Sequence, residues 1–245
     1  MANPGQFPYQ IGIHSYTSSG TGYLCGGSIT SKNWILTAGH CVDGKVSATI
    51  IAGSININDY DENSQIRSAS KGDFYLHPSY QSGSLKNDIA MIFVPDLIFT
   101  DFVQPVDLLY SNESYVGEET YIAGWGVTDV NNTLSDDLLY VELMVDEFKK
   151  CNRTYGSLRE QKQICLKATD TMSPCPGDSG GPLVLAESEY GINYGQIGLV
   201  SFGSNCTNGD PVVFTRVSGY RTFIENTMIS RYCSMGSCFG LPGRN

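Results

Sequence analysis

The sequence predicts an all-β protein that ends in one α-helix. Short runs rich in β-branched and aromatic residues alternate with turn residues along most of the 245-residue chain, as in β-sandwiches and β-barrels. The 27 glycines supply the frequent turns that such folds need. Hydrophobic residues make up 41% of the chain and charged residues only 16%, which argues against intrinsic disorder because a core can be buried.

Several segments have the composition expected of strands, because β-branched and aromatic residues are flanked by Gly, Asn, Ser or Asp. A helix is predicted to begin with Ser218 as its N-cap, since apolar residues recur three and four positions apart up to residue 232. A second helical turn is predicted at Asp146–Cys151. The predicted strands are Tyr9–Tyr16, Asn33–Thr37, Ala48–Ala52, Ile89–Val94, Thr120–Ala123, Leu138–Val145, Pro182–Leu185, Gln196–Phe202 and Val212–Val217.

The charge and the apolar runs exclude two classes of partner. The net charge is −10, and a chain this acidic would repel the phosphates of a nucleic acid. Apolar stretches such as Ile89–Val94 are far shorter than the roughly 20 residues of a membrane span. The opening segment Met1–Gly5 has neither a basic nor an apolar region, so it does not read as a signal peptide.

The cysteines indicate an oxidising, extracellular setting. There are 8 of them, spread along the chain with no CxxC pair, which favours disulfides over a zinc site. Four glycosylation sequons agree with this setting, although chance accounts readily for at least one. They begin at Asn112, Asn131, Asn152 and Asn205.

The 3 histidines differ in their surroundings. His14 fits a solvent-facing position on a strand, and His77 fits a surface turn. His40 lies where an apolar strand ends beside Cys41, and small residues leave room for its imidazole. Taken alone, this position favours a structural role for His40 over a catalytic one.

Two further strings carry candidate chemistry. In Gly177–Pro182 a serine is flanked by glycines; on a tight turn, the N–H groups of Gly177 and Ser179 would converge as in the oxyanion hole of an acyl transferase. Asp88 leads an apolar strand, where a buried carboxylate needs a partner such as histidine. The alternatives are an ordinary glycine-rich turn and an exposed aspartate ending a loop.

These strings occur in the order His40, Asp88, Ser179, and with this order the chain resembles the chymotrypsin–trypsin family of serine endopeptidases. The resemblance extends from about Ala2 to about Tyr232. Gly39 departs from the family pattern, in which alanine is usual, but removes no functional group. The matching segments are Pro4–Gln10, Cys25–Ile29, Thr37–Cys41, Asp88–Ala90, Gly124–Gly126 and Gly177–Pro182.

The resemblance implies two six-stranded antiparallel β-barrels with the active site between them. The protease domain would cover residues 1–232, with the first barrel at about 1–110, the second at about 111–217 and the helix at about 218–232, followed by a loose tail at 233–245. A bond between Cys233 and Cys238, which lie beyond the family pattern, is only a hypothesis. The disulfides implied by the resemblance are Cys25–Cys41, Cys151–Cys165 and Cys175–Cys206.

The resemblance also implies a Ser-His-Asp mechanism. Ser179 would attack the peptide carbonyl, His40 would transfer the proton to the leaving amine, and Asp88 would fix the imidazole tautomer and stabilise the imidazolium. The N–H groups of Gly177 and Ser179 would hold the oxyanion. We expect no cofactor and no required metal, because the acidic loop around Asp61 (with Asp59 and Glu62) lacks the spacing of an EF-hand.

The implied substrate pocket predicts chymotrypsin- or elastase-like specificity for large apolar residues on the acyl side. Ser173, six residues before the nucleophile, is neutral where trypsin-like members have aspartate, so a buried Lys or Arg would be unpaired. Gly203 leaves the entrance open, and Val212 stands where glycine is common and would shorten the pocket. The segment Ser201–Gly203 would pair with the substrate main chain, with Phe202 where tryptophan is usual.

Family members become active when cleavage frees an N-terminus that pairs with the aspartate before the nucleophile, here Asp178. No Ile-Val-Gly-Gly segment precedes Ala2, so the chain as written is expected to have a zymogen-like oxyanion hole. The alternative is that the natural protein has further residues upstream.

The expected protein is a secreted monomer that cleaves proteins or peptides, that protein inhibitors could control, and that has no nucleic-acid or membrane partner. Two other classes compete with this interpretation. A catalytically inactive homologue acting as a binding module would usually lack a triad residue. A disulfide-rich structural or adhesive protein would not explain the three strings in order.

Overall fold

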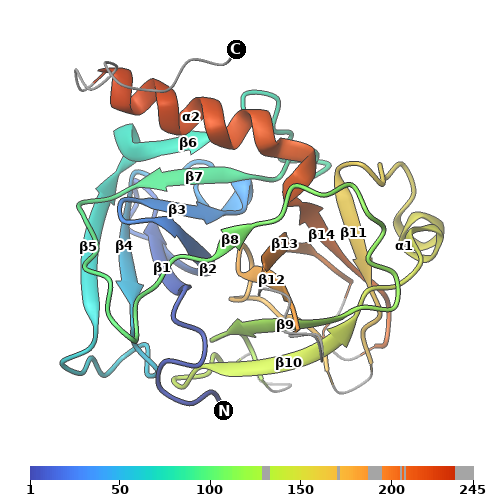
Figure 1. Cartoon of the computed structure of the whole chain (residues 1–245), viewed down its shortest axis with the longest axis horizontal. Coiled ribbons are helices and arrows are strands. Elements are labelled where there is room, and N and C mark those ends of the chain that lie inside the picture. Colours follow the sequence, from blue (N-terminus) through green and yellow to red (C-terminus); the bar gives the residue numbers. More distant parts are fainter. Residues whose placement is uncertain (129–132, 170–171, 187–194, 205, 207, 235–245) are drawn as a thin grey trace.

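The computed structural model describes residues 1–128, 133–169, 172–186, 195–204, 206 and 208–234. These residues form two curled β-sheets that lie side by side, with a C-terminal helix across one of them (Figure 1). The mostly β fold and the terminal helix confirm the predicted fold class.

The first sheet has the strand order β5-β4-β1-β2-β3-β7-β6. Its two edge strands, β5 and β6, are consecutive in the chain and are joined by the short 3-10 helix Lys71–Asp73. Apolar side chains such as Ile13, Ile35 and Ile50 fill its interior. The strands are β1 (Gln10–Tyr16), β2 (Gly22–Ser31), β3 (Trp34–Thr37), β4 (Ser47–Ala52), β5 (Gln65–Ser70), β6 (Phe74–Leu76) and β7 (Ala90–Phe93).

The second sheet has the antiparallel order β10-β9-β12-β13-β14-β11, and β8 adds a parallel pair to β13. In the described residues each sheet therefore has 7 strands, one more than the 6 expected, because a turn separates β5 from β6 and because β8 joins the second sheet from before residue 110. The strands are β8 (Asp107–Leu108), β9 (Glu119–Gly124), β10 (Leu139–Met144), β11 (Gln163–Leu166), β12 (Pro182–Leu185), β13 (Gly195–Phe202) and β14 (Val212–Arg216).

The sequence analysis missed β2, β5, β6, β8 and β11. In β2 the reason is glycine, a poor strand former: a Cβ on Gly26 would lie 2.8 Å from the Cα of Gly181, which directly precedes β12 of the other sheet. Glycine at this point of β2 therefore lets the two sheets approach closely. β6 and β8 are too short to show a periodicity, and β5 is rich in polar residues.

The helices differ from their predicted limits. The predicted turn at Asp146–Cys151 is the helix α1 (Phe148–Tyr155), which ends at Gly156 with φ of 64°. Ser218 is not an N-cap as predicted: it lies inside a 3-10 helix, Val217–Tyr220, that leads into α2 (Arg221–Ser234). The tighter turn forms because Val217 and Tyr220 are both buried there.

Helix α2 covers the first sheet, although it follows the last strand of the second (Figure 1). Ile224 and Tyr220 pack in one cluster with Trp34 and Met91. The end of the chain therefore ties the two sheets together. In the part of the chain that the structure describes, no helix has the length and apolar character that crossing a bilayer requires; residues 235–245, most of the predicted tail, lie outside that part.

Candidate active site

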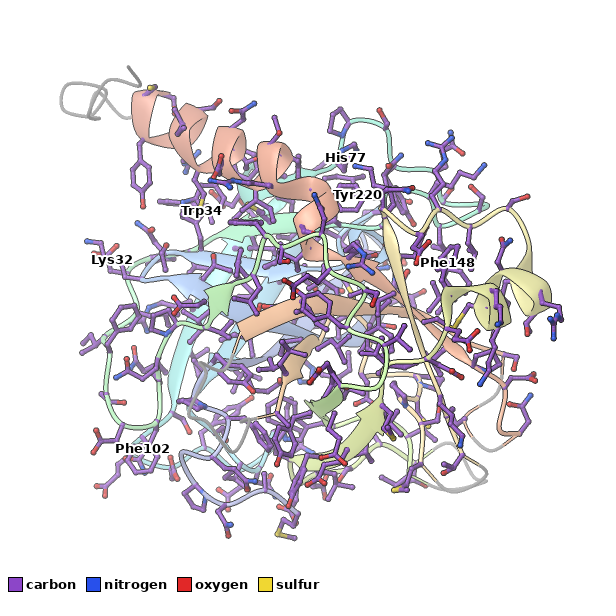
Figure 2. All side chains as sticks on the ribbon, turned by 45° about the vertical axis from the view of Figure 1, so that its right-hand side comes forward. Lys32, Trp34, His77, Phe102, Phe148 and Tyr220 are labelled. Carbon is purple, nitrogen blue, oxygen red and sulfur yellow. A yellow bond between two sulfur atoms is a disulfide. The ribbon has the colours of Figure 1, made fainter. Side chains whose placement is uncertain are left out.

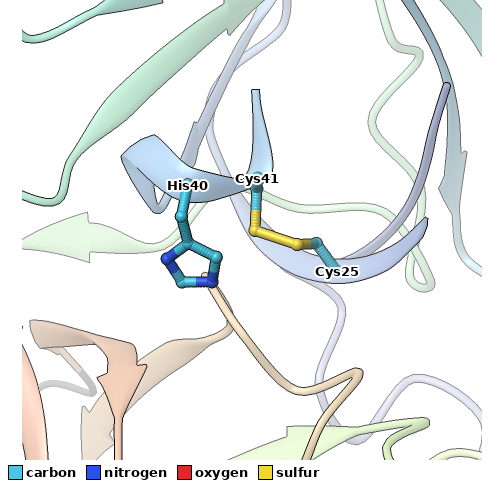
Figure 3. Close-up of side chains that lie close together, drawn as sticks. All are labelled: Cys25, His40 and Cys41. Carbon is cyan, nitrogen blue, oxygen red and sulfur yellow. A yellow bond between two sulfur atoms is a disulfide. The ribbon is translucent and has the colours of Figure 1, made fainter. Parts of the chain in front are cut away.

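His40 lies on the short 3-10 helix Gly39–Cys41, directly after the buried strand β3. The disulfide between Cys25 and Cys41 joins this helix to β2 (Figure 3). The His40 side chain is 26% exposed, so it is held firmly and still reaches solvent.

Asp88 lies just before β7, is 1% exposed, and is the hydrogen-bond partner of His40. Its Oδ2 is 2.9 Å from His40 Nδ1, and its Oδ1 accepts the His40 backbone N–H at 2.9 Å. Because an ionised carboxylate only accepts hydrogen bonds, the shared proton belongs on Nδ1. This tautomer leaves the Nε2 lone pair of His40 available.

The second sheet completes the environment of Asp88. Ser201 in β13 donates its hydroxyl to Asp88 Oδ2 at 2.6 Å, and Thr215 in β14 donates to the Asp88 carbonyl at 2.8 Å. The sequence analysis assigned Ser201 only to substrate pairing, and it missed Thr215. Neither hydroxyl has a sequence signal of its own, since the contacts join segments more than a hundred residues apart.

Ser179 lies on a turn that packs against the residues around His40. Its carbonyl accepts the Gly26 N–H at 2.7 Å and lies 3.5 Å from Cys41 Sγ. The next residue, Gly180, has φ of 78°, and a Cβ there would be 2.8 Å from the backbone nitrogen of Ala38. Only glycine fits this position, so the sequence Gly177–Pro182 brings Ser179 to the end of β3 that carries His40.

The N–H groups predicted for the oxyanion hole are available. Among the described residues, neither the Gly177 nor the Ser179 backbone N–H donates to a protein acceptor. Gly177 has φ of 104°, in the region that favours glycine, and packs against Gly126. Both donors are therefore free to bind an oxygen atom of a ligand.

Asp178, between those two donors, packs its carboxylate against Gly124 and Gly126. It accepts the backbone N–H groups of Gly126 at 2.8 Å and Cys175 at 2.9 Å. Desolvation raises the pKa of Asp178 to about 6, although the two backbone hydrogen bonds oppose that shift. Within the described part of the chain, no cation forms a salt bridge with Asp178.

The predicted pocket residues lie on β13, on β14 and on the segment before Asp178. Val212 is 3% exposed, and its Cγ2 lies 3.5 Å from where a Cβ on Gly203 would be. The Phe202 ring packs edge-on against Tyr155 at 5.4 Å. Ser173 is half-buried and donates its hydroxyl to the Pro174 carbonyl.

Two of the three predicted disulfides are present, Cys25–Cys41 and Cys151–Cys165. The third prediction is wrong for this structure: Cys175 and Cys206 are free thiols. Burial raises the pKa of the Cys175 thiol, and a hydrogen bond with Cys206 raises it further. The fold thus places the two thiols within hydrogen-bonding contact of each other, although no covalent bond joins them. Cys238, the predicted partner of Cys233, lies outside the described residues.

Among the described residues, three potential metal ligands lie close together: the ligand atoms of Cys25, His40 and Cys41 are all within 4.8 Å of one another (Figure 3). Both sulfurs are in the disulfide, so neither is a thiolate ligand. In the acidic loop, Asp61 accepts hydrogen bonds from its own neighbours Asn63 and Ser64. That the protein requires no metal stays a prediction.

The sequons at Asn112 and Asn152 begin with exposed residues. Asn131 and Asn205 lie outside the described residues. The predicted glycosylation is therefore sterically open at two positions.

Comparisons with known proteins agree with this geometry. Residues 1–224 match the family described as Trypsin. "Serine protease 1" of Drosophila melanogaster is 37% identical over 94% of this chain and 84% of its own length. "Chymotrypsin-2" of Vespa crabro is 35% identical over 92% of this chain and 96% of its own length.

A solved structure of HL collagenase superimposes with a TM-score of 0.82 and 31% identity, covering 93% of this chain and 96% of that one. The chain belongs to the trypsin family. It is a serine-type endopeptidase with chymotrypsin-like architecture, and its substrates are proteins or peptides.

Proposed function

We propose that this protein is a secreted endopeptidase in which Ser179, His40 and Asp88 form the catalytic triad of a domain covering residues 1–232. The observation that carries this proposal is the hydrogen bond of 2.9 Å between His40 Nδ1 and Asp88 Oδ2, beside the Ser179 turn. The trypsin-family match and the order His40, Asp88, Ser179 in the chain support it.

The reaction proceeds in two halves. Ser179 Oγ bonds to the peptide carbonyl carbon while His40 Nε2 takes the hydroxyl proton. His40 then gives this proton to the amine nitrogen as the C–N bond breaks, which leaves an acyl-enzyme. Water attacks the ester, its proton passes to His40, and the serine hydroxyl is restored as the acid departs. Asp88 stabilises the imidazolium in both halves.

The free N–H groups of Gly177 and Ser179 bind the oxyanion that forms in each half. Donors of this kind contribute about 10²–10³ in kcat each. Asp178 lies between them, and we propose that it pairs with an N-terminal amine in the active form. The desolvation of the Asp178 carboxylate, which forms no salt bridge among the residues that the structure describes, supports this pairing.

The proposed specificity is for Leu, Met, Phe or Tyr on the acyl side, with a shortened pocket. Ser173 is neutral, and the packing of Val212 beside Gly203 supports a smaller pocket than glycine would leave. The chymotrypsin and elastase names of several relatives agree with an apolar preference. A panel of chromogenic peptides tests it, and faster cleavage after Arg than after Leu or Phe contradicts it.

The proposed location of the protein is extracellular. We propose that it acts there as a monomer that protein inhibitors can control. Two disulfides support it, since such bonds persist in oxidising compartments. We expect the native host to secrete the protein, and we expect size-exclusion chromatography to give the mass of a monomer.

A fluorophosphonate that labels active-site serines tests the catalytic proposal. Peptide mapping is expected to find one adduct, on Ser179, and none in Ser179→Ala. His40→Ala is expected to lower the labelling rate without removing Ser179. Absence of an adduct on Ser179 in a form with a free Ile-Val-Gly-Gly N-terminus contradicts the proposal.

A further inference from the structure

Asn87, the residue before Asp88, has an unusual backbone held by its own side chain. Its φ is 55°, in the left-handed region that few residues other than glycine adopt and that asparagine tolerates best. Its Nδ2 donates to the Ser79 carbonyl at 2.7 Å, and its Oδ1 accepts the Tyr220 hydroxyl at 3.2 Å. Both ends of the amide are therefore used to hold this conformation.

The Tyr220 hydroxyl is one of three that reach residues 87 and 88 from the second half of the molecule. Ser201 donates to the Asp88 carboxylate, Thr215 to the Asp88 carbonyl and Tyr220 to the Asn87 side chain. Asp88 itself leads into β7 of the first sheet. The orientation of its carboxylate thus depends on contacts made only after the two halves dock.

The Tyr220 ring is held independently of its hydroxyl. It packs edge-on against His77 at 5.4 Å between centroids, and Lys162 Nζ lies 4.1 Å from its centroid. Figure 2 shows Tyr220 and His77 together where the chain enters α2. Phenylalanine at this position would keep the packing and lose only the hydrogen bond.

We propose that Tyr220 is a positioning residue: through Asn87 it orients Asp88, and through Asp88 it orients His40 and stabilises its protonated form. Thr215 does the same through the Asp88 peptide. This inference rests on the proposed role of Asp88 beside His40. Without the Tyr220 hydroxyl, Asn87 loses one of the two bonds that hold its left-handed backbone, and the carboxylate that follows is less well aimed.

The titratable groups around Asp88 are few. His40 faces it directly, and Tyr80 and Tyr220 lie close enough for its charge to raise the pKa of each, although burial contributes more to both shifts. Asp43 acts on Tyr80 in the same direction. Both tyrosines are therefore neutral near pH 7.

The test compares Tyr220→Phe with a matched control, Tyr232→Phe. Tyr232 also donates its hydroxyl to an asparagine of the first half, Asn33 Oδ1 at 2.8 Å, but far along α2 from Asp88. In the full chain, NMR titration of the 3 histidines gives the pKa of His40, assigned with His40→Ala. The same proteins give kcat and KM on an apolar peptide.

Tyr220→Phe is expected to move the His40 titration to lower pH, because a misaligned Asp88 stabilises the imidazolium less. We expect kcat to fall about tenfold, as for loss of one hydrogen bond, with KM unchanged. Tyr232→Phe is expected to change neither. The inference is overturned if Tyr220→Phe leaves the His40 titration unchanged and kcat within twofold of the parent value. It is also overturned if Tyr232→Phe reproduces both changes.

A second pair keeps the test decisive if Tyr220→Phe does not fold. Thr215→Val removes the hydroxyl and is expected to lower the pKa of His40, whereas Thr215→Ser keeps the donor and is expected to retain it; equal values in both contradict the inference. Failure of the proposed function is distinguishable, because it appears as absence of a Ser179 adduct in the parent, whereas the titration reports on His40 without turnover.

Discussion

Asp88 and Asp178 are both enclosed carboxylates beside the reacting groups, yet their partners differ. Asp88 accepts hydrogen bonds from the Nδ1–H and the backbone N–H of His40 and from the hydroxyl of Ser201. Asp178 accepts two backbone N–H groups and has no cation in the described part of the chain, and its pKa rises to about 6. His40 and Asp88, the residues proposed to handle the proton, are joined by hydrogen bonds, whereas the proposed oxyanion donors lie on either side of a carboxylate whose pKa is raised to about 6.

This difference teaches that the two halves of one site need not be organised together. The surroundings of Asp88 depend on how the two sheets dock, which the core of the molecule determines. The surroundings of Asp178 depend on a charge that has no partner among the described residues. The proposed dyad of His40 and Asp88 and the proposed oxyanion donors are therefore expected to respond differently to mutation and to pH.

The largest effect is expected for Asp88→Asn. The neutral amide cannot hold the Nδ1–H tautomer of His40, and kcat is expected to fall by about 10⁴, as in other Ser-His-Asp enzymes. Steady-state kinetics on an apolar chromogenic peptide measures it. The control is Asp96→Asn, an exposed aspartate paired with Lys32, which is expected to leave kcat unchanged; a drop of less than tenfold for Asp88→Asn would contradict the dyad.

The second largest effect on kcat is expected when Asp178 is given an N-terminal amine to pair with. A form with an Ile-Val-Gly-Gly N-terminus and a spacer before Ala2, released by a processing protease, is expected to raise kcat by about a hundredfold or more, the value of a formed oxyanion donor. Asp178→Asn in the released form is expected to lose that gain. Equal turnover by the released form and the chain as given would show that Asp178 needs no amine.

The free energy of unfolding of the chain as given is expected to decrease as pH rises, because of Asp178. Its folded pKa of about 6 lies above the value of about 4 for an unfolded aspartate, so the folded state binds the proton more tightly. Full stability is present below about pH 4, and at most about 3 kcal/mol is lost as pH rises to about 6.

Urea unfolding of the parent and Asp178→Asn between pH 4 and 7 measures this loss. Asparagine does not titrate, so only the parent is expected to lose this stability as pH rises. The difference between the two free energies of unfolding is therefore expected to become constant at low pH and to change between pH 4 and 7. Parallel pH dependences in both proteins would mean that Asp178 is not the group responsible.

The smallest effect is expected for Gly39→Ala, which probes the packing on the Asp88 side. A Cβ there would lie 2.9 Å from Leu76 Cδ1, 3.0 Å from Tyr80 Cδ2 and 3.2 Å from Asp88 Oδ1. Overpacking of this kind costs about 1–3 kcal/mol of unfolding free energy, and kcat is expected to fall with it. Gly83→Ala, where a Cβ would meet nothing within 4 Å, is the control; equal melting temperatures for the two variants would show that the site yields freely.

Much of the site was predictable because its residue types are unusual where they occur. A serine in a glycine-rich turn, a histidine beside a cysteine and an aspartate before an apolar strand are local patterns. The structure brings His40 and Asp88 within 2.9 Å of each other, and the catalytic roles of the three residues stay predictions. Gly180 illustrates why the glycine-rich turn was predictable. Its positive φ and the close approach of Ala38 leave glycine as the only residue type that fits, so the sequence alone indicates this tight turn.

The sequence by itself determined the β-rich class, the family and the order of His40, Asp88 and Ser179, since short-range patterns carry all three. Only the tertiary structure decided that Ser201, Thr215 and Tyr220 hold residues 87 and 88, and that Cys175 and Cys206 are unbonded neighbours. The physical reason is range: a serine, threonine or tyrosine hydroxyl has the same local signature whether it faces water or a buried carboxylate. Its partner is chosen only when two sheets, distant in the chain, pack against each other.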